Sequence, residues 1–506
     1  MTVAINLPNS DQIKHLAASF GIELSDADAR SFEALVAGMK PSYDRLDVLQ
    51  EDRLPVKYPR LPGRAPSEAE NPHNAWAWLC EIQGAKKGVL AGKRVAIKDN
   101  VCVAGVPMRN GNRQLEGYVP DIDATVVTRI LDAGGSIAGK VVNEDLCFSG
   151  HSITSQPGVV RNPHRPTHGA GGSSSGSGAA IAAGDVTMAL GGDQGGSVRI
   201  PAAWSGIVGL KATHGLVPYT GVFPIEATID HCGPMGATVE DVARLLTAIA
   251  GPDGLDPRQV NVSVGDYLAA IKQPLKGLKI AVVSEGFNRP ESDAATDKKV
   301  RAATKELKAA GARVTEVSIP EHLDGPHIWT GIIIEGATEL MIKGNSMGYS
   351  WQGYYTVSLL DAWARGWHSR PNDLPETAKM VLFMGEYLKR YYHGRFYAKS
   401  QNLRRKLRAA YDAVLAEHDV LAMPTIPFRA TAFPEGKTRE DVIGVALNMV
   451  GNTCPFDVSG HPAISVPCGI HEQLPIGLML IGRSYDEATV LRAAAGLEKL
   501  GDWKTM

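Results

Sequence analysis

Apolar residues follow a helical pattern at the start of the chain. In residues 10–50 they recur every three to four positions in two separate runs. Gly21 ends the first run, and Pro41 ends or kinks the second. Helices this short cannot enclose a core of their own. We therefore expect residues 1–75 to form a helical extension that packs on another subunit, as a dimer contact, or that covers the main body of the protein.

Beyond Gly88 the pattern alternates between short β-type runs and helical runs. This alternation predicts a layered α/β architecture. The predicted strands are Arg94–Ile97, Ser136–Lys140, Val186–Leu190, Leu278–Ser284, Arg313–Ile319, Val420–Met423, Ala463–Val466 and Ile476–Ile481. The predicted helices of the same region are Thr125–Ala133, Thr296–Ala310 and Asp486–Leu500.

Residues 323–415 have a different composition. Helical periodicity dominates, and aromatic residues concentrate there, namely Trp329, Tyr349, Trp351, Tyr354, Tyr355, Trp363, Trp367, Phe383, Tyr387, Tyr391 and Tyr392. The segment predicts a smaller, mainly helical insertion between two parts of one main domain, residues 76–322 and 416–506. An ordinary aromatic core would account for many of the same residues.

Length and composition narrow the class of protein. At 506 residues the chain is too long for one simple core, so two or three structural units are expected. Its net charge of −2 argues against nucleic-acid binding, which requires a basic face. The first residues lack the pattern of a secretion signal, and no window approaches the 18 uninterrupted apolar residues of a membrane span. We expect a cytoplasmic protein without a membrane segment.

The cysteines and histidines do not follow metal-binding patterns. The six cysteines are widely spaced and none forms a C-x-x-C pair, which favours free thiols over a zinc site or a disulfide scaffold. The histidines lack the spacing of helical metal ligands, so we predict no metal site. His168 directly precedes a cluster of serines and is the histidine that most needs a test.

That cluster belongs to the stretch His168–Ala202, which holds two groups of glycine and serine. They are Gly171–Gly178, reading GGSSSGSG, and Gly191–Ser197, reading GGDQGGS. Flexible linkers are polar on both sides, whereas these groups border apolar residues, which favours a buried and shaped backbone. Glycines allow the close backbone approach that aims main-chain N–H groups at a developing anion. A hydroxyl at the end of such a run is a candidate nucleophile.

These two groups, together with GKRVAIKDN at Gly92–Asn100, resemble the amidase signature family of serine amidohydrolases. The resemblance continues in NTCPFDVSGHPAISVPC and LPIGLMLIGR near the C-terminus. The motif DQGGS is most similar to the corresponding motif of bacterial amidases that accompany nitrile hydratases. The resemblance implies an α/β/α layered fold around a central mixed β-sheet. It also favours a homodimer contact for the N-terminal helices.

The resemblance implies a serine, a second serine and a lysine as the catalytic residues. By this comparison, Ser197 is the nucleophile, Ser173 the bridging serine and Lys98 the base. The peptide bond Gly172–Ser173 should be cis. The oxyanion hole should consist of backbone N–H groups, those of Gln194, Gly195, Gly196 and Ser197.

Lysine acts as a base only when its amine is uncharged, and burial among apolar groups favours that form. The apolar residues before Lys98 are consistent with burial. We expect Lys98 to take the proton of Ser173 while Ser173 takes that of Ser197, which attacks a carbonyl. Asp193 and Arg199 flank the nucleophile, and we interpret them as a structural ion pair.

Three further residues are expected to line the acyl site, namely Phe148, Ile229 and Trp329, although each could equally be an ordinary core residue. Together they would favour a hydrophobic or aromatic acyl group. The resemblance implies hydrolysis of a small carboxamide to carboxylate and ammonia, without a cofactor. Other members of the family act on N-substituted amides, carbamates or hydrazides, and the motifs do not separate these substrates.

Three other functions compete with this hypothesis, namely two other enzymes and a binding protein. Gly172–Gly176 also satisfies G-x-S-x-G, which would make Ser174 the nucleophile of an α/β-hydrolase, but no apolar strand precedes it. An amidotransferase A subunit is disfavoured by the helical extension and by the wording Asp193–Gln194. A binding protein without catalysis is disfavoured because Lys98, Ser173 and Ser197 are all present.

Overall fold

Three short helices form the N-terminal part of the chain. The computed structural model describes residues 5–156, 158–436 and 438–505, and the chain divides into two units, Met1–Leu54 and Pro55–Met506. The first unit contains α1 (Ser10–Ser19), α2 (Asp26–Ala37) and α3 (Lys40–Val48). Pro41 lies in the first turn of α3, where its missing N–H costs nothing. The helical extension expected over residues 1–75 thus corresponds to a unit that ends at Leu54.

The N-terminal helices leave most of their apolar side chains exposed. Helix α1 packs against α2, but among the described residues of the helices only Ala17 and Ala29 are buried. Large apolar side chains that are about half exposed or more include Leu16, Phe20, Ile22, Phe32, Leu35, Met39, Leu46 and Val48. An apolar surface of this kind is typical of an interaction site.

The second unit is built on one sheet of 11 strands in its described part. In chain order the strands are β1 (Trp76–Gln83), β2 (Arg94–Lys98), β3 (Ser136–Val141), β4 (Met188–Asp193), β5 (Val208–Lys211), β6 (His231–Gly236), β7 (Lys279–Val283), β8 (Arg313–Val317), β9 (Val420–Pro424), β10 (Ala463–His471) and β11 (Leu474–Ile481). Their order in the sheet is β1-β3-β2-β4-β6-β5-β10-β11-β9-β7-β8. Strand β2 is parallel to β3 and β4, whereas β4 is antiparallel to β6. The predicted mixed sheet is confirmed.

Helices cover the sheet in layers. They are α4 (Thr125–Asp132), α5 (Ser175–Ala182), α6 (Arg199–Ser205), α7 (Val239–Ile249), α8 (Tyr267–Ala270), α9 (Ala294–Ala309), α14 (Arg439–Ala446), α15 (Cys454–Ser459) and α16 (Glu487–Glu498). Helices α5 and α6 pack on each other and on strands, while α4, α7 and α16 form a second connected layer. Helix α5 is almost entirely small residues and is buried over Ser175–Ile181, so it can lie close to the sheet.

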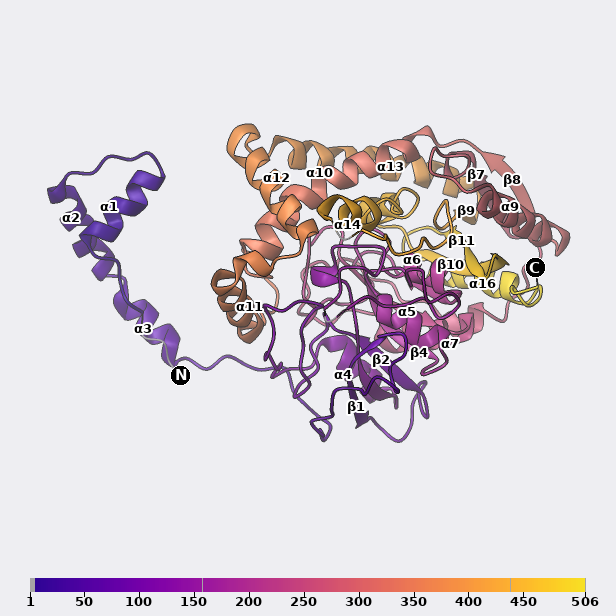
Figure 1. The fold of residues 1–506 in the computed structure, drawn as a ribbon, viewed down its shortest axis with the longest axis horizontal. Coiled ribbons are helices and arrows are strands. Elements are labelled where there is room, and N and C mark those ends of the chain that lie inside the picture. The colour runs from indigo at the N-terminus through magenta and orange to yellow at the C-terminus, as the bar shows by residue number, and fades with distance from the viewer. Residues whose placement is uncertain (1–4, 157, 437, 506) are drawn as a thin grey trace. The chain divides into compact units, whose positions relative to one another are not determined.

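The aromatic segment of the sequence is helical. It contains α10 (Gly325–Ala337), α11 (Val357–Ser369), α12 (Glu376–Tyr392) and α13 (Arg395–Glu417). Helix α10 packs on α12 and α13 (Figure 1) and also on α15. Short helical turns complete the chain, namely η1 (Asp145–Cys147), η2 (Ser284–Gly286), η3 (Pro320–Asp324), η4 (Thr338–Ile342) and η5 (Pro371–Asp373). The division into residues 76–322, 323–415 and 416–506 stays a prediction. No helix in the described chain is long and apolar enough to cross a bilayer.

Candidate active site

Lys98 and Ser173 meet in the interior of the second unit. Lys98 is the last residue of β2, and Ser173 precedes α5; both side chains are fully buried. The Nζ atom of Lys98 lies 2.8 Å from Ser173 Oγ and 3.4 Å from the carbonyl oxygen of Gly192. The Gly172–Ser173 peptide bond is cis, as the resemblance implied.

The third predicted residue, Ser197, lies where β4 gives way to α6. Its carbonyl accepts a hydrogen bond of 3.2 Å from the N–H of Ser174, which joins the two glycine-serine groups. Ser197 is only 7% exposed and faces a cavity with about 30 Å³ of free space. In the described structure its hydroxyl makes no hydrogen bond to a protein group, and none joins it to Ser173.

The backbone N–H groups around Ser197 divide into occupied and available ones. The N–H of Gly196 donates to Asp193 Oδ1 at 2.6 Å, so Gly196 has to be removed from the predicted oxyanion donors. Its N–H is occupied because the Asp193 carboxylate folds back over the start of the turn. Within the described residues, the N–H groups of Gln194, Gly195 and Ser197 have no hydrogen-bond acceptor.

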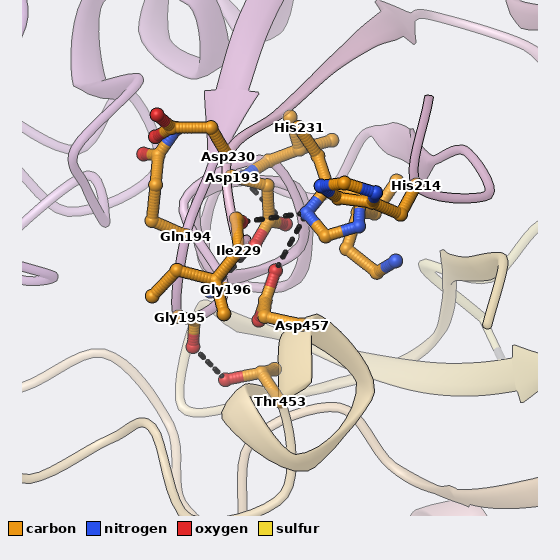
Figure 2. Close-up of polar contacts among 12 residues, drawn as sticks. Asp193, Gln194, Gly195, Gly196, His214, Ile229, Asp230, His231, Thr453 and Asp457 are labelled. Atoms are coloured by element: carbon orange, nitrogen blue, oxygen red, sulfur yellow. Dashed lines mark hydrogen bonds and ion pairs between the residues drawn. The ribbon is translucent and has the colours of Figure 1, made fainter. Parts of the chain in front are cut away.

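A buried ion cluster holds the segment between β4 and α6 in place, and Figure 2 labels two of its members, Asp193 and Asp457. The predicted ion pair between Asp193 and Arg199 is present at 2.9 Å, and Arg199 also contacts Asp457 of α15 at 2.7 Å. Burial disfavours the charged form, but Arg199 outweighs it and lowers the pKa of Asp193. Burial and the neighbouring Asp193 raise the pKa of Asp457 well above its usual range. Asp193 therefore carries the negative charge that Arg199 balances.

Two of the three predicted acyl-site residues line the cavity beside Ser197. Phe148 and Trp329 are there, together with Ile200, Ile225, Ile333, Leu447 and Val450. Ile229 is not among the residues that line the cavity, so the prediction for this residue is corrected. Its side chain is buried, and its carbonyl accepts a hydrogen bond of 2.7 Å from His231 Nδ1. Ile225, four residues earlier in the sequence, is one of the aliphatic residues that line the cavity.

Comparison with known proteins places this site in a family. A family model described as Amidase matches residues 66–491. The chain is 47% identical over 503 residues to an enantioselective amidase of Rhodococcus rhodochrous, covering 98% of this chain and 96% of that protein. The chain belongs to the amidase family. It is an amide-hydrolysing enzyme.

Glutamyl-tRNA(Gln) amidotransferase subunits A are more distant relatives of this amidase. That of Synechococcus sp. (strain CC9902) is 38% identical over 421 residues, covering 83% of this chain and 84% of that protein. The crystal structure of the Thermotoga maritima subunit has a TM-score of 0.70 at 32% identity and covers 85% of this chain and 88% of its own. The similarity to the Rhodococcus amidase extends over the N-terminal helices, because it leaves only about 2% of the chain unmatched.

The other polar residues that were considered as candidates in the sequence make contacts that support the backbone or lie away from the cavity. The Ser174 hydroxyl is 3.2 Å from both the N–H and the carbonyl oxygen of Gly192, and Ser177 Oγ donates to the Leu190 carbonyl at 2.9 Å. His168 is half-buried, contacts Thr167 at 2.9 Å and is not among the residues that line the cavity. These contacts disfavour Ser174 as the nucleophile.

Two residues that hold the turn before Ser197 were not predicted from the sequence. Thr453 Oγ1 donates to the carbonyl of Gly195 at 2.5 Å (Figure 2), and Asp457 completes the ion cluster. Both lie in NTCPFDVSGHP, which carried the resemblance but no assigned role. Spacing alone could not bring this segment to Ser197, because about 250 residues separate them in the sequence.

Proposed function

We propose that the protein hydrolyses carboxamides to carboxylate and ammonia through an acyl-enzyme on Ser197. The observation that carries the proposal is the buried hydrogen bond between Lys98 Nζ and Ser173 Oγ. Among the described residues, no carboxylate forms an ion pair with Lys98. A buried amine that lies within hydrogen-bond distance of a hydroxyl and has no carboxylate partner can, in its uncharged form, accept the proton of that hydroxyl.

The reaction would proceed through a proton relay. Lys98 takes the proton of Ser173 as Ser173 takes that of Ser197, and Ser197 Oγ bonds to the carbonyl carbon. When the C–N bond breaks, the relay returns one proton to the leaving nitrogen, and ammonia departs. Water then attacks the acyl-enzyme by the same route and releases the carboxylic acid and the Ser197 hydroxyl.

The negative oxygen of the tetrahedral intermediate requires donors that no protein group occupies. The N–H groups of Gln194, Gly195 and Ser197 meet this condition, and their residues line the cavity. Donors that are already in place cost no reorganisation when the charge develops. We therefore assign the oxyanion hole to these three groups.

The lining of the cavity supports neutral, apolar acyl groups. Its side chains are mainly aromatic or aliphatic and include none with a full charge. A buried charge without a partner would be disfavoured there. The free space of about 30 Å³ is close to the share of one water molecule, so an aromatic acyl group requires the wall residues to move outward.

The decisive assay incubates the isolated chain with aliphatic and aromatic primary amides, for which it measures ammonia release, and with N-substituted amides, for which it measures release of the carboxylate or the amine. We expect turnover of propionamide and benzamide, and loss of turnover in Ser197→Ala. Preference for an anilide, carbamate or hydrazide would assign the alternative substrates within the family. If glutamine is the only substrate that releases ammonia, and if the release requires added partner proteins, the chain is an amidotransferase A subunit instead.

The exposed apolar side chains of the N-terminal unit support a homodimer. Burying such side chains contributes on the order of 25 cal/mol per Å², and a second copy of the same unit offers a matching surface by symmetry. Deleting residues 1–54 should convert a dimer into a monomer in light scattering after size-exclusion chromatography. A full-length protein that is monomeric at micromolar concentration would contradict this.

Free cysteines support a location in the cytoplasm. All six cysteines are buried and unpaired, which suits a reducing compartment. Fractionation of the source cells should recover the protein with cytoplasmic markers. Recovery with secreted or membrane markers would overturn this assignment.

A further inference from the structure

We propose that Trp329 is a positioning residue for the oxyanion hole, in addition to being part of the cavity wall. Its indole N–H fixes the peptide between Gln194 and Gly195, and this aims the N–H of Gly195 at the substrate oxygen. The inference rests on the proposed function, because it concerns the donors that stabilise the tetrahedral intermediate.

The contact joins two distant parts of the chain. Trp329 lies on α10, and its Nε1 atom donates to the carbonyl oxygen of Gln194 at 2.7 Å. The indole ring also lies against Gly195, since a Cβ atom built at this glycine would be 3.0 Å from Trp329 Cζ2. The ring thus contacts the peptide both through its N–H and through its edge.

Peptide geometry links this contact to the oxyanion donor. The Gln194–Gly195 bond is trans, because Gly172–Ser173 is the cis bond found in the described chain. In a trans peptide the C=O and the N–H point in opposite directions. A carbonyl that is held by the indole therefore directs the N–H of Gly195 away from Trp329, and this N–H is one of those without a protein acceptor.

The neighbouring peptides of the turn are fixed in other ways. The carbonyl of Gly196 accepts from Ile200 N at 2.7 Å in the first turn of α6, which orients the N–H of Ser197. The peptide between Gly195 and Gly196 is held at both ends, by Thr453 and by Asp193. The Gln194–Gly195 peptide precedes a glycine, whose backbone is free to rotate, so its orientation depends on Trp329.

This role predicts a kinetic effect that a wall residue would not produce. Loss of one preorganised donor in other enzymes lowers kcat by 10²–10³, and a donor that is present but poorly aimed should cost less. We expect Trp329→Phe, which keeps an aromatic ring and removes the N–H, to lower kcat by roughly 10- to 100-fold with KM changed by less than about threefold.

The test compares two inhibitors in Trp329→Phe and in control variants. Phenylboronic acid becomes tetrahedral and anionic on a serine, whereas benzyl alcohol occupies an apolar wall without an oxyanion. In Trp329→Phe the affinity for phenylboronic acid should fall by the same factor as kcat, whereas the affinity for benzyl alcohol should change little. Ile333→Ala alters the wall without removing a donor, and it should weaken both ligands alike.

Trp363→Phe is the matched control for the loss of an indole. Trp363 is buried on α11, and its Nε1 donates to the Met341 carbonyl at 2.9 Å. This variant should keep the wild-type ratio of kcat to boronate affinity. If Trp329→Phe does not fold, 3-benzothienylalanine at position 329 keeps the bicyclic ring, lacks the N–H and should give the same kinetic result.

The outcomes separate this inference from the proposed function. A wild-type enzyme that phenylboronic acid does not inhibit would overturn the serine mechanism itself, and with it the positioning role. A wild-type enzyme that is inhibited, with a Trp329→Phe variant that raises KM at unchanged kcat or weakens both ligands equally, would overturn the positioning role alone.

Discussion

Two neighbouring lysines of the sheet differ in their partners. Lys140 on β3 is buried and forms an ion pair of 3.0 Å with Asp99. Lys98 on the adjacent strand β2 is equally buried, yet it donates to the hydroxyl of Ser173. At the scale of residues, this difference in partners supports the proposal that Lys98 is the base and Lys140 is not.

Substitution of the relay should therefore abolish most of the activity. General acid–base catalysis contributes about 10²–10⁴ to a rate, so Lys98→Ala and Ser173→Ala should each lower kcat by at least about 10²-fold. Ser177→Ala is the matched control, because its hydroxyl contacts only a backbone carbonyl, and it should keep most of the activity. Steady-state ammonia release checks all three, and a Lys98→Ala enzyme within tenfold of wild type would refute the relay.

At the scale of elements, a fully buried guanidinium joins β4, α6 and α15. Arg199 contacts Asp193 and Asp457, and all three side chains are fully buried. Removing one partner of such a group leaves an uncompensated charge and typically costs about 3–5 kcal/mol. We expect Arg199→Met to lower the free energy of unfolding by about this amount in urea titrations. A loss below about 1 kcal/mol would show that the cluster does not hold these elements together.

Much of the element order followed from the apolar pattern, and the exceptions have a physical cause. The strand predicted at Val186–Leu190 lies at Met188–Asp193. Gly191 and Gly192 have low β-propensity, but they extend the strand because they pair with β6. Strands β5 and β6 were missed for the same reason, since pairing and not local propensity defines them.

In the candidate site, too, features set by a short local sequence could be predicted, whereas features set by contacts between distant segments could not. The motifs around Lys98, Ser173 and Ser197 could be recognised in the sequence because each is a short continuous segment. All three side chains are buried, and Lys98 contacts Ser173. The occupied N–H of Gly196 and the replacement of Ile229 by Ile225 could not be predicted, because each depends on the exact path of the backbone.

At the scale of the whole molecule, buried histidines contribute to the dependence of stability on pH. Burial lowers the pKa of His151 and His322 to about 4 and that of His214 to about 3. Their ordinary value is about 6.5, so the unfolded chain binds protons between pH 6.5 and 4 while the folded chain does not. The contribution of these histidines to stability is therefore full above pH 6.5 and falls as the pH drops, by about 1.4 kcal/mol per pH unit for each histidine.

This dependence can be measured by urea unfolding between pH 7.5 and 5. His322→Gln removes one such group and should reduce the slope of stability against pH below 6.5 by about 1.4 kcal/mol per unit, whatever its effect at pH 7.5. An unchanged slope would show that His322 does not remain neutral in the folded state.

The identity of the nucleophile can be tested directly with a fluorophosphonate that reacts with activated serines. Peptide mass spectrometry of the labelled wild-type enzyme should find the adduct on Ser197, with no labelling in Ser197→Ala and strongly slowed labelling in Lys98→Ala. An adduct on Ser174, or equal labelling of Ser197→Ala, would contradict the account.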